Sequence, residues 1–399
     1  MRAESEGIPT RGGRRYRMIL WLLIAGIAVW HLNNLRAAVR VGTIPMYDVI
    51  EYWAAGRVLL SGGNPYGAAD LLAVHREAAW ADERPIRMWN PPWVLPLVLP
   101  FAILPYWWGR AAWCLVHLLV IVGSADWLWR TAGGPMSRRW IGWLGALFYI
   151  PSVMALFLGQ ISPLMLAGIV GFLWSIQENR QARAGIFTLL IAVKPHVLHL
   201  FWIFLLLWSW KERKLHVLFA SAAAILLSTL AAILMDASIL RQYIEALRSE
   251  AGPQIWHTPT WGVALYVMAP QLGKWVRFIP TGVGAFVALA LWRRWRDTFD
   301  WQRCLPPILL LSIITSSFTW MFDWVVLIPV LVVILVSLWN SPPSRRWWLI
   351  AGLLAIEAGL IVQPAFARSN FYTIWMPLAL ALVYLRRRAP EAALRRPAS

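Results

Sequence analysis

Charged residues and cysteines are both scarce in this chain of 399 residues. Only 14% of the residues are charged and 59% are hydrophobic, whereas a soluble domain is about 25% charged. The two cysteines, Cys114 and Cys304, are too few and too far apart for a disulfide framework or a cysteine metal cluster. This composition excludes an ordinary soluble globular protein.

The motifs of nucleotide and metal chemistry are also missing. The sequence has no Gly-rich loop of the Walker type, no His-Glu-x-x-His and no Cys-x-x-Cys. We therefore do not expect the protein to use a cytoplasmic nucleotide, and an activated substrate would have to be carried in the membrane. We expect no cofactor and no resident metal, although the sequence leaves dependence on a divalent metal open.

Long apolar runs recur from residue 18 to residue 385 instead. A membrane-spanning helix needs roughly 20 apolar residues, and about 17 are tolerated. The 29 tryptophans fit the same environment, because amphipathic tryptophan favours membrane interfaces. We predict an all-α polytopic integral membrane protein with about twelve spans of this length. The predicted spans cover residues 18–38, 107–129, 140–158, 161–177, 183–194, 197–210, 215–235, 276–295, 305–319, 324–340, 346–363 and 371–385.

The positions of lysine and arginine predict the orientation of these spans. The net charge of +18 comes largely from short basic loops, and such loops face the cytoplasm. No nucleic-acid partner is needed to explain them. Residues 1–17 and 386–399 are then cytoplasmic tails of a cell-membrane protein. The other side receives a first extracytoplasmic loop, residues 40–106, and a second large loop, residues 236–275.

The first outer loop is expected to contain interfacial helices and no folded soluble domain. The helix predicted after the first span places Val49, Trp53 and Leu60 near one face. The segment 93–105 is apolar but carries three prolines, each of which removes a backbone donor. We therefore predict that this segment lies at the outer interface and does not cross the membrane.

Polar side chains at membrane depth are costly and are usually functional. In this chain they come from seven separate places in the sequence, and the predicted topology brings all seven to the outer side. Polar groups without a shared function would be divided between the two sides. The residues are Asp48, Glu51, Asn90, Gln160, Lys194, His196, His199, His257, Asp323 and Gln363.

Asp48 is the first candidate for chemistry, because it lies at the expected boundary between the first span and water. A carboxylate there is able to take a proton from an incoming hydroxyl as a general base. The alternative is a helix N-cap, because Asp48 precedes a helix and Glu51 follows three residues on, as in a capping box. The two roles are compatible.

Lys194 stands in the middle of an apolar stretch and is followed by Pro195. An unpaired lysine at membrane depth costs about 3 kcal/mol on insertion scales, so Lys194 needs an anionic partner, and the neighbouring sequence offers none. A lipid phosphate would serve, with His196 as a further donor. The alternative is that the ammonium group snorkels to the interface.

Asp323 follows a run of hydroxyl residues between two apolar spans. It is a candidate for holding a cation, binding sugar hydroxyls or pairing with Lys194, and the alternative is an ordinary carboxylate in a short outer turn. Gln160 and Asn90 fit either substrate binding or turn chemistry. We group Glu51, Asn90, Gln160, His257 and Asp323 as candidate substrate-binding residues.

The order and spacing of six segments make the chain resemble a known family, glycosyltransferase family 87. The enzymes of this family use polyprenol-phosphate sugars and have the C-type membrane glycosyltransferase fold. The best-known members are α-mannosyltransferases of bacterial envelopes. The matching segments are residues 47–66, 89–105, 156–174, 189–207, 258–265 and 316–332.

The resemblance implies an inverting transfer from a polyprenyl-phosphate sugar, in which an acceptor hydroxyl attacks the anomeric carbon and the lipid phosphate leaves. It also implies that an aspartate of the first outer loop, here Asp48, is the general base. The Lys-Pro element of the family corresponds to Lys194 and Pro195, for which a phosphate-binding role is expected. The role of Glu51 stays open.

We therefore expect a membrane enzyme that transfers a hexose such as mannose to an extracytoplasmic lipid or glycan acceptor. Membrane lipids and the lipid-linked donor are its expected partners. One alternative is a transporter or flippase of a lipid-linked sugar, which predicts two repeated halves with broken helices. A second alternative is a non-catalytic membrane subunit, which does not explain why ionisable residues gather on one side.

Overall fold

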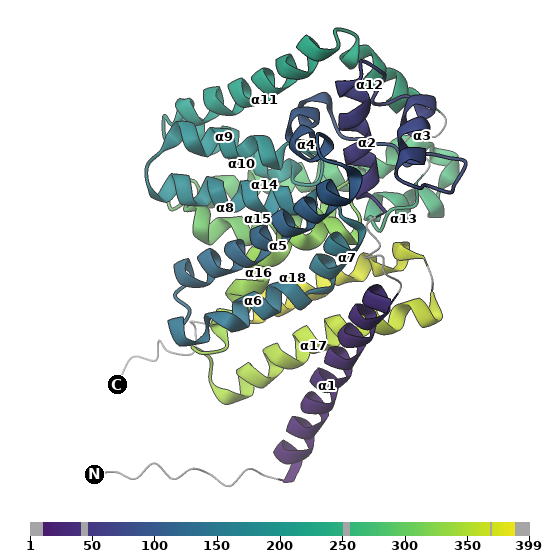
Figure 1. Cartoon of the computed structure of the whole chain (residues 1–399). Helices are drawn as coiled ribbons and strands as arrows, with labels where there is room; N and C mark the ends of the chain where they lie inside the picture. Colours follow the sequence, from purple (N-terminus) through teal and green to yellow (C-terminus); the bar gives the residue numbers. More distant parts are fainter. Residues whose placement is uncertain (1–10, 41–46, 250–255, 368, 388–399) are drawn as a thin grey trace.

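The computed structural model describes residues 11–40, 47–249, 256–367 and 369–387 as helices and loops, with no strand in these ranges. The helices form one bundle (Figure 1). The α-helices are α1 (Arg11–Arg40), α2 (Val49–Leu60), α3 (Ala68–Glu77), α4 (Leu95–Ala102), α5 (Tyr106–Thr131), α6 (Arg139–Phe148), α7 (Ile150–Leu158), α8 (Ser162–Gln177), α9 (Gln181–Ile191), α10 (His199–Lys211), α11 (Leu215–Met235), α12 (Ile239–Arg248), α13 (Trp261–Met268), α14 (Ile279–Trp295), α15 (Trp301–Thr315), α16 (Ile328–Ser337), α17 (Pro343–Phe366) and α18 (Met376–Arg386). Short 3₁₀ helices include η1 (Pro92–Val94), η6 (Met321–Leu327) and η7 (Asn370–Trp375).

Helical structure occupies every predicted span, and α11 has the predicted bounds. Within the described ranges, four helical segments are long and apolar enough to cross a membrane, at Tyr106–Thr131, Leu215–Met235, Lys274–Trp295 and Pro343–Phe366. The bent pair α6–α7 would make five. The fold is thus that of an all-helical membrane protein, and a larger number of crossings stays a prediction.

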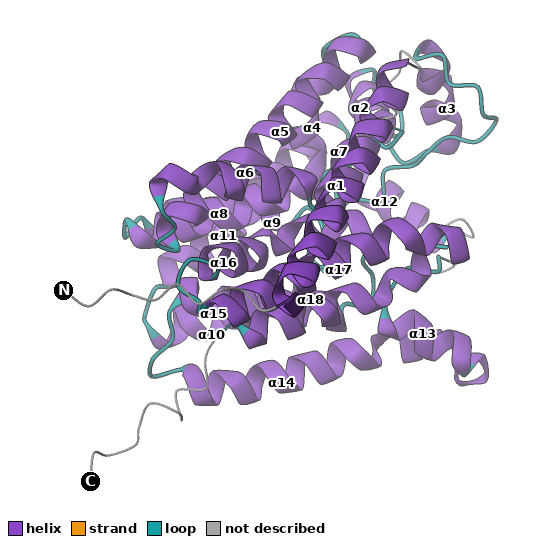
Figure 2. Ribbon diagram, turned by 90° about the horizontal axis from the view of Figure 1, so that it is seen from below, coloured by secondary structure: helices purple, strands orange, loops and turns teal. Residues whose placement is uncertain are grey.

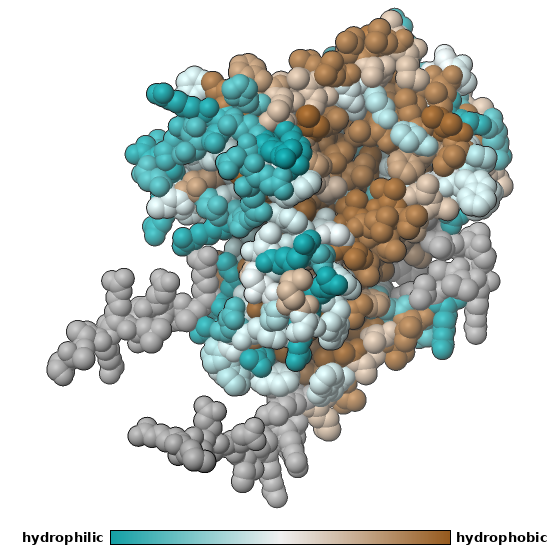
Figure 3. Space-filling view, turned by 60° about the vertical axis from the view of Figure 1, so that its left-hand side comes forward, coloured by the Kyte–Doolittle hydropathy of each residue, from teal (hydrophilic) through white to brown (hydrophobic). Residues whose placement is uncertain are grey.

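The outward surface of the bundle is apolar over the long helices. Leu234 on α11 is 79% exposed and Phe286 on α14 is 74% exposed, which suits a surface that faces lipid. In Figure 3, hydrophilic residues gather towards one end of the face shown, beside a broad hydrophobic surface. Figure 2 shows α1 crossing the outside of the bundle, where it packs against α17.

The loops that the sequence predicts to be cytoplasmic meet one another. The Arg138 guanidinium lies 5.7 Å from the centre of the Trp339 ring, which joins the loop before α6 to the loop after α16. The Lys211 ammonium lies 3.4 Å from a carboxylate oxygen of Asp297, which joins the loops after α10 and α14. These two contacts thus bring four of the predicted cytoplasmic loops together in pairs.

The position of α2 corrects the prediction for the first outer loop. Ten of its 12 residues are buried, and it packs against α3, α4 and α5, so it does not lie on the membrane with one apolar face in lipid. Gly56 lets α4 approach closely, because a Cβ atom at this position would be 2.6 Å from Cβ of Ala102. The sequence pattern predicted one apolar face for α2, but other helices cover several of its faces.

The proline-containing segment 93–105 folds as η1 and α4. The eight residues of α4 give a helix of only about 12 Å, which is far too short to cross a bilayer of about 30 Å. The indole Nε1 of Trp53 donates to the carbonyl oxygen of Leu104 at 2.9 Å and fixes the end of the segment against α2. As predicted, this segment does not form a spanning helix.

The predicted span 140–158 is broken in the middle. The segments Met136–Phe148 and Ile150–Leu158 meet at an angle of 58°, because Tyr149 leaves the helical conformation at ψ 119°. Pro151 follows and has no backbone donor. The second half, α7, packs closely against η6 and ends at Gly159, whose φ of +72° suits glycine.

Candidate active site

All eight side chains that the sequence predicts for the site line one cavity. Its volume is about 940 Å³, within the usual size of a ligand site. The residues come from the first outer loop and α2, the α7–α8 and α9–α10 turns, the loop before α13, and η6. They are Asp48, Glu51, Asn90, Gln160, Lys194, His196, His257 and Asp323.

The two remaining polar residues of the sequence prediction are not in this cavity. His199 begins α10, and its Nε2 lies 3.4 Å from the hydroxyl of Thr315. Gln363 is on α17, where its Nε2 donates to the carbonyl oxygen of Ala367 at 3.5 Å. Both side chains therefore have local structural contacts.

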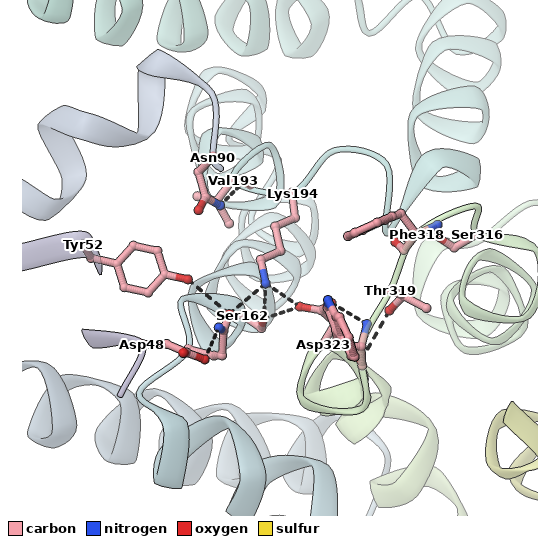
Figure 4. A network of polar contacts seen from close by, with 12 residues as sticks. Asp48, Tyr52, Asn90, Ser162, Val193, Lys194, Ser316, Phe318, Thr319 and Asp323 are labelled. Atoms are coloured by element: carbon pink, nitrogen blue, oxygen red, sulfur yellow. Dashed lines mark hydrogen bonds and ion pairs between the residues drawn. The ribbon is translucent and has the colours of Figure 1, made fainter. Parts of the chain in front are cut away.

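Gln160 belongs to the polar floor of the cavity, the network in which Figure 4 shows Asp48, Tyr52, Lys194 and Asp323 close together. Its Nε2 donates to Oδ2 of Asp48 at 2.5 Å. Its Oε1 accepts from the Tyr52 hydroxyl at 3.1 Å and from the Lys194 ammonium at 2.9 Å. Because lysine is only a donor, these contacts fix the orientation of the amide, and Gln160 links the candidate base to Lys194.

Lys194 forms an ion pair with Asp323 at 2.7 Å between Nζ and Oδ1. The same ammonium also donates to Gln160 and to the Ser162 hydroxyl, which lies at 3.3 Å. The anionic partner that the sequence requires is thus Asp323, one of the pairings proposed for it. Three oxygen atoms hold the ammonium inside the cavity, so it does not snorkel to the interface.

Asp323 is almost completely buried and is held from several sides. Its side chain is 2% exposed, Oδ1 also accepts from the Ser162 hydroxyl at 2.5 Å, and Oδ2 accepts from the Trp320 backbone N–H at 2.8 Å. Together with Lys194, these contacts use three of the roughly four acceptor sites of the carboxylate. Asp323 therefore stabilises Lys194 and the start of η6 rather than standing alone in an outer turn.

The backbone of Asp48 is fixed by a hydrogen bond, and its carboxylate lines the cavity. Its N–H donates to the carbonyl oxygen of Leu158 at 2.8 Å, and its side chain makes no capping hydrogen bond to α2. The N-cap alternative is therefore not what fixes this side chain. Burial raises the pKa of the Asp48 carboxyl, while the hydrogen bond from Gln160 and the charge of Lys194 act in the opposite direction.

Glu51 is more deeply enclosed than Asp48, with 7% of its surface exposed. Burial, and next the charge of Asp48, raise the pKa of Glu51 well above its usual range. Burial thus disfavours the charged form of Glu51, and Asp48, which is less enclosed, is the carboxylate better suited to accept a proton.

The other predicted residues lie on the walls of the cavity. The Asn90 side chain donates to the carbonyl oxygen of Val193 at 2.9 Å and ties the first outer loop to the turn that carries Lys194. Burial lowers the pKa of His196 to about 4, so its imidazole is neutral at pH 7. His257 is exposed and lines the cavity.

An aromatic wall completes the cavity and was not predicted from the sequence. Trp256 meets Trp89 edge to face at a centroid distance of 5.7 Å and contacts Phe318 at 5.5 Å. Arg87 also lines the cavity. The only sequence signal for it is that an arginine directly precedes the apolar segment 88–105.

No group of three or more His, Cys, Asp or Glu side chains within the described ranges is placed to hold a metal ion. The cavity instead combines a carboxylate with an accessible face, a fixed amide, an ion pair and apolar rings. This arrangement suits proton transfer next to an apolar, partly anionic substrate.

Comparisons with known proteins identify the family. No curated protein and no solved structure matches the chain. The family model of glycosyltransferase family 87 matches residues 89–305, just over half of the chain. The match includes Gln160 and Lys194 but not Asp48 or Asp323. By this match the chain belongs to glycosyltransferase family 87, and together with its apolar helices this makes it a membrane glycosyltransferase.

Proposed function

We propose that the protein transfers a hexose, with mannose as the first candidate, from a polyprenyl-phosphate sugar to an extracytoplasmic lipid or glycan acceptor. The observation that carries the proposal is that Asp48, Gln160 and Lys194, which are far apart in the sequence, line one cavity. A lipid-linked donor suits a cavity formed among apolar helices, because its tail stays in the hydrocarbon.

In the proposed reaction Asp48 is the general base. An acceptor hydroxyl donates its proton to the Asp48 carboxylate while its oxygen bonds to the anomeric carbon. The bond from that carbon to the phosphate oxygen breaks, and the electron pair leaves with the polyprenyl phosphate. Attack from the face opposite the phosphate inverts the anomeric centre. Gln160 positions Asp48 through its hydrogen bond of 2.5 Å.

The cavity side is proposed to be extracytoplasmic, with both termini in the cytoplasm. The contacts between loops that are predicted to be cytoplasmic, together with their basic composition, support this orientation. In a variant whose native cysteines are replaced by alanine, a membrane-impermeant thiol reagent should label Ala69→Cys in intact cells but not Glu212→Cys. Labelling of Glu212→Cys alone would reverse the orientation.

The enzymatic proposal is tested with purified protein in lipid nanodiscs and a radiolabelled polyprenyl-phosphate hexose. With a membrane-lipid extract as the source of acceptor, we expect a labelled product and release of polyprenyl phosphate. Both should be lost in Asp48→Asn. Movement of the donor across a proteoliposome membrane without release of polyprenyl phosphate would favour a flippase instead.

A further inference from the structure

The two cations that line the cavity differ in whether they have an anionic partner. Among the described residues, two permanent cations, Arg87 and Lys194, and three carboxyl groups, Asp48, Glu51 and Asp323, face it. The donor of the proposed function carries a phosphodiester with one negative charge, and polyprenyl phosphate leaves with additional charge. A cavity that accepts this group needs a cation that is not already neutralised.

Lys194 does not meet this requirement. An ammonium group has three N–H donors, and the three oxygens of Gln160, Ser162 and Asp323 take all of them. The carboxylate of Asp323 at 2.7 Å also neutralises the charge. A phosphate could gain full contact with Lys194 only by displacing one of these partners.

Arg87 differs from Lys194 in each of these respects. It is half-buried, and within the described ranges no carboxylate lies within ion-pair distance of it. Its guanidinium lies 6.0 Å from the centre of the Trp89 ring, near the limit of a cation–π contact. Trp89 is packed edge to face on Trp256, so Arg87 is next to a fixed aromatic wall. No side chain or carbonyl in the described part of the chain accepts a hydrogen bond from its guanidinium.

We propose that Arg87 is the principal contact to the phosphate of the lipid-linked donor, an inference that rests on the proposed function. The planar guanidinium presents paired N–H groups that match two phosphate oxygens, which a single ammonium does not. Lys194 then positions Gln160 and Asp323 in the floor of the cavity. Because charge on the phosphate grows as the sugar leaves, the Arg87 contact also strengthens during the reaction.

The test measures how three probes bind to the purified full-length protein in nanodiscs. The change in tryptophan fluorescence on binding is the readout. The probes are farnesyl phosphate, the uncharged alcohol farnesol, and inorganic phosphate. We expect the wild type to bind farnesyl phosphate more tightly than the other two. Arg87→Gln should weaken farnesyl phosphate binding roughly 10- to 100-fold, the value of charge-assisted hydrogen bonds, with farnesol binding unchanged. Arg87→Lys should lose less.

Arg84→Gln is the matched control, because Arg84 is an exposed arginine three residues away in the same loop and does not line the cavity. It should bind farnesyl phosphate as the wild type does. Retained farnesol binding shows that Arg87→Gln is folded. If Arg87→Gln binds farnesyl phosphate as tightly as the wild type, the role of Arg87 is wrong while the lipid-phosphate donor stands.

Two further outcomes separate the sources of the phosphate. If the wild type does not prefer farnesyl phosphate to farnesol, both the lipid-phosphate donor and the Arg87 assignment fail. If inorganic phosphate binds as tightly as farnesyl phosphate and depends equally on Arg87, the site takes a free anion, and the assignment to the lipid-linked donor is overturned.

Discussion

Both ends of α7 are next to polar side chains. The C-terminal end, here called the open end, borders the cavity, whereas the N-terminal end, here called the closed end, does not. At the C-terminal end, Gln160 bonds side chains that face an open cavity. At the N-terminal end, Glu357 of α17 accepts from the Ile150 backbone N–H at 3.2 Å, and His31 of α1 hydrogen-bonds the carbonyl of Phe148. These contacts satisfy backbone groups that the break in the helix leaves free.

The comparison shows that an ionisable residue among apolar helices has two possible roles. At the closed end, Glu357 and His31 satisfy the backbone of a broken helix, which is required where no water is present. At the open end, Asp48 and Lys194 share Gln160 as a hydrogen-bond partner and line the cavity. Besides these contacts, α7 packs against η6, which carries Asp323.

The largest effect on activity is expected from Asp48→Asn at the open end. General-base catalysis contributes about 10²- to 10⁴-fold, so turnover should fall by about this factor. Thermal stability should stay near that of the wild type, since the Asp48 side chain caps no helix and asparagine still accepts from Gln160. Turnover and melting temperature measured together check this, and full activity in Asp48→Asn would remove the assignment of the base.

The largest effect on stability is expected from Lys194→Met. The variant leaves the buried carboxylate of Asp323 without its cation, which typically costs about 3–5 kcal/mol. Considered from the sequence alone, the same change would leave folding intact or improve it, and the ion pair reverses that expectation. Denaturant unfolding measures the loss. Asp323→Asn added to Lys194→Met should recover part of it, and no recovery would argue against the pair.

A smaller effect is expected from Glu357→Leu at the closed end. Loss of the acceptor leaves the Ile150 N–H unpaired, at a cost of about 1–3 kcal/mol of stability. Glu357→Gln keeps an acceptor oxygen and should behave like the wild type. Melting temperatures of the two variants make the test. Equal losses in both would mean that the negative charge, and not the hydrogen bond, matters at this position.

The pH dependence of turnover gives a finer test of the open end. A general base works only when it is deprotonated, so activity is present above the pKa of Asp48 and is lost as the pH falls through it. Burial raises the pKa of Asp48, and the hydrogen bond from Gln160 opposes this rise. Gln160→Met should therefore move the acidic limb of the kcat profile to higher pH. A limb that stays in place would mean that another group titrates.

The smallest effect is expected from Glu51→Gln. Burial raises the pKa of Glu51 in the folded protein, so the stability that its bound proton contributes is present at low pH and is lost as the pH rises through the folded pKa. Glutamine has no proton to lose. In melting curves the variant should therefore lose less stability than the wild type as the pH rises. Greater alkali sensitivity would show that Glu51 functions as an anion.

The sequence predicted that ten polar residues would gather on one side, because the basic loops place the polar segments on the other side. Eight of the ten line the cavity, and His199 and Gln363 do not. The sequence left open how these residues pair, since the contact of Lys194 with Asp323 joins positions 129 residues apart. Arg87 was missed because an arginine in a loop is ordinary by composition. The break at Tyr149 was missed because the run 140–158 is apolar throughout, and Pro151 alone did not mark a bend.

The volume of the cavity has a consequence for side reactions. A space of about 940 Å³ holds roughly 30 molecules of water at bulk density. In the transfer that we propose, each water molecule near the anomeric carbon competes with the acceptor as a nucleophile. Asp48 would activate either one. Fidelity then depends on the acceptor displacing solvent when it binds, and slow hydrolysis of the donor without acceptor would be the observable result.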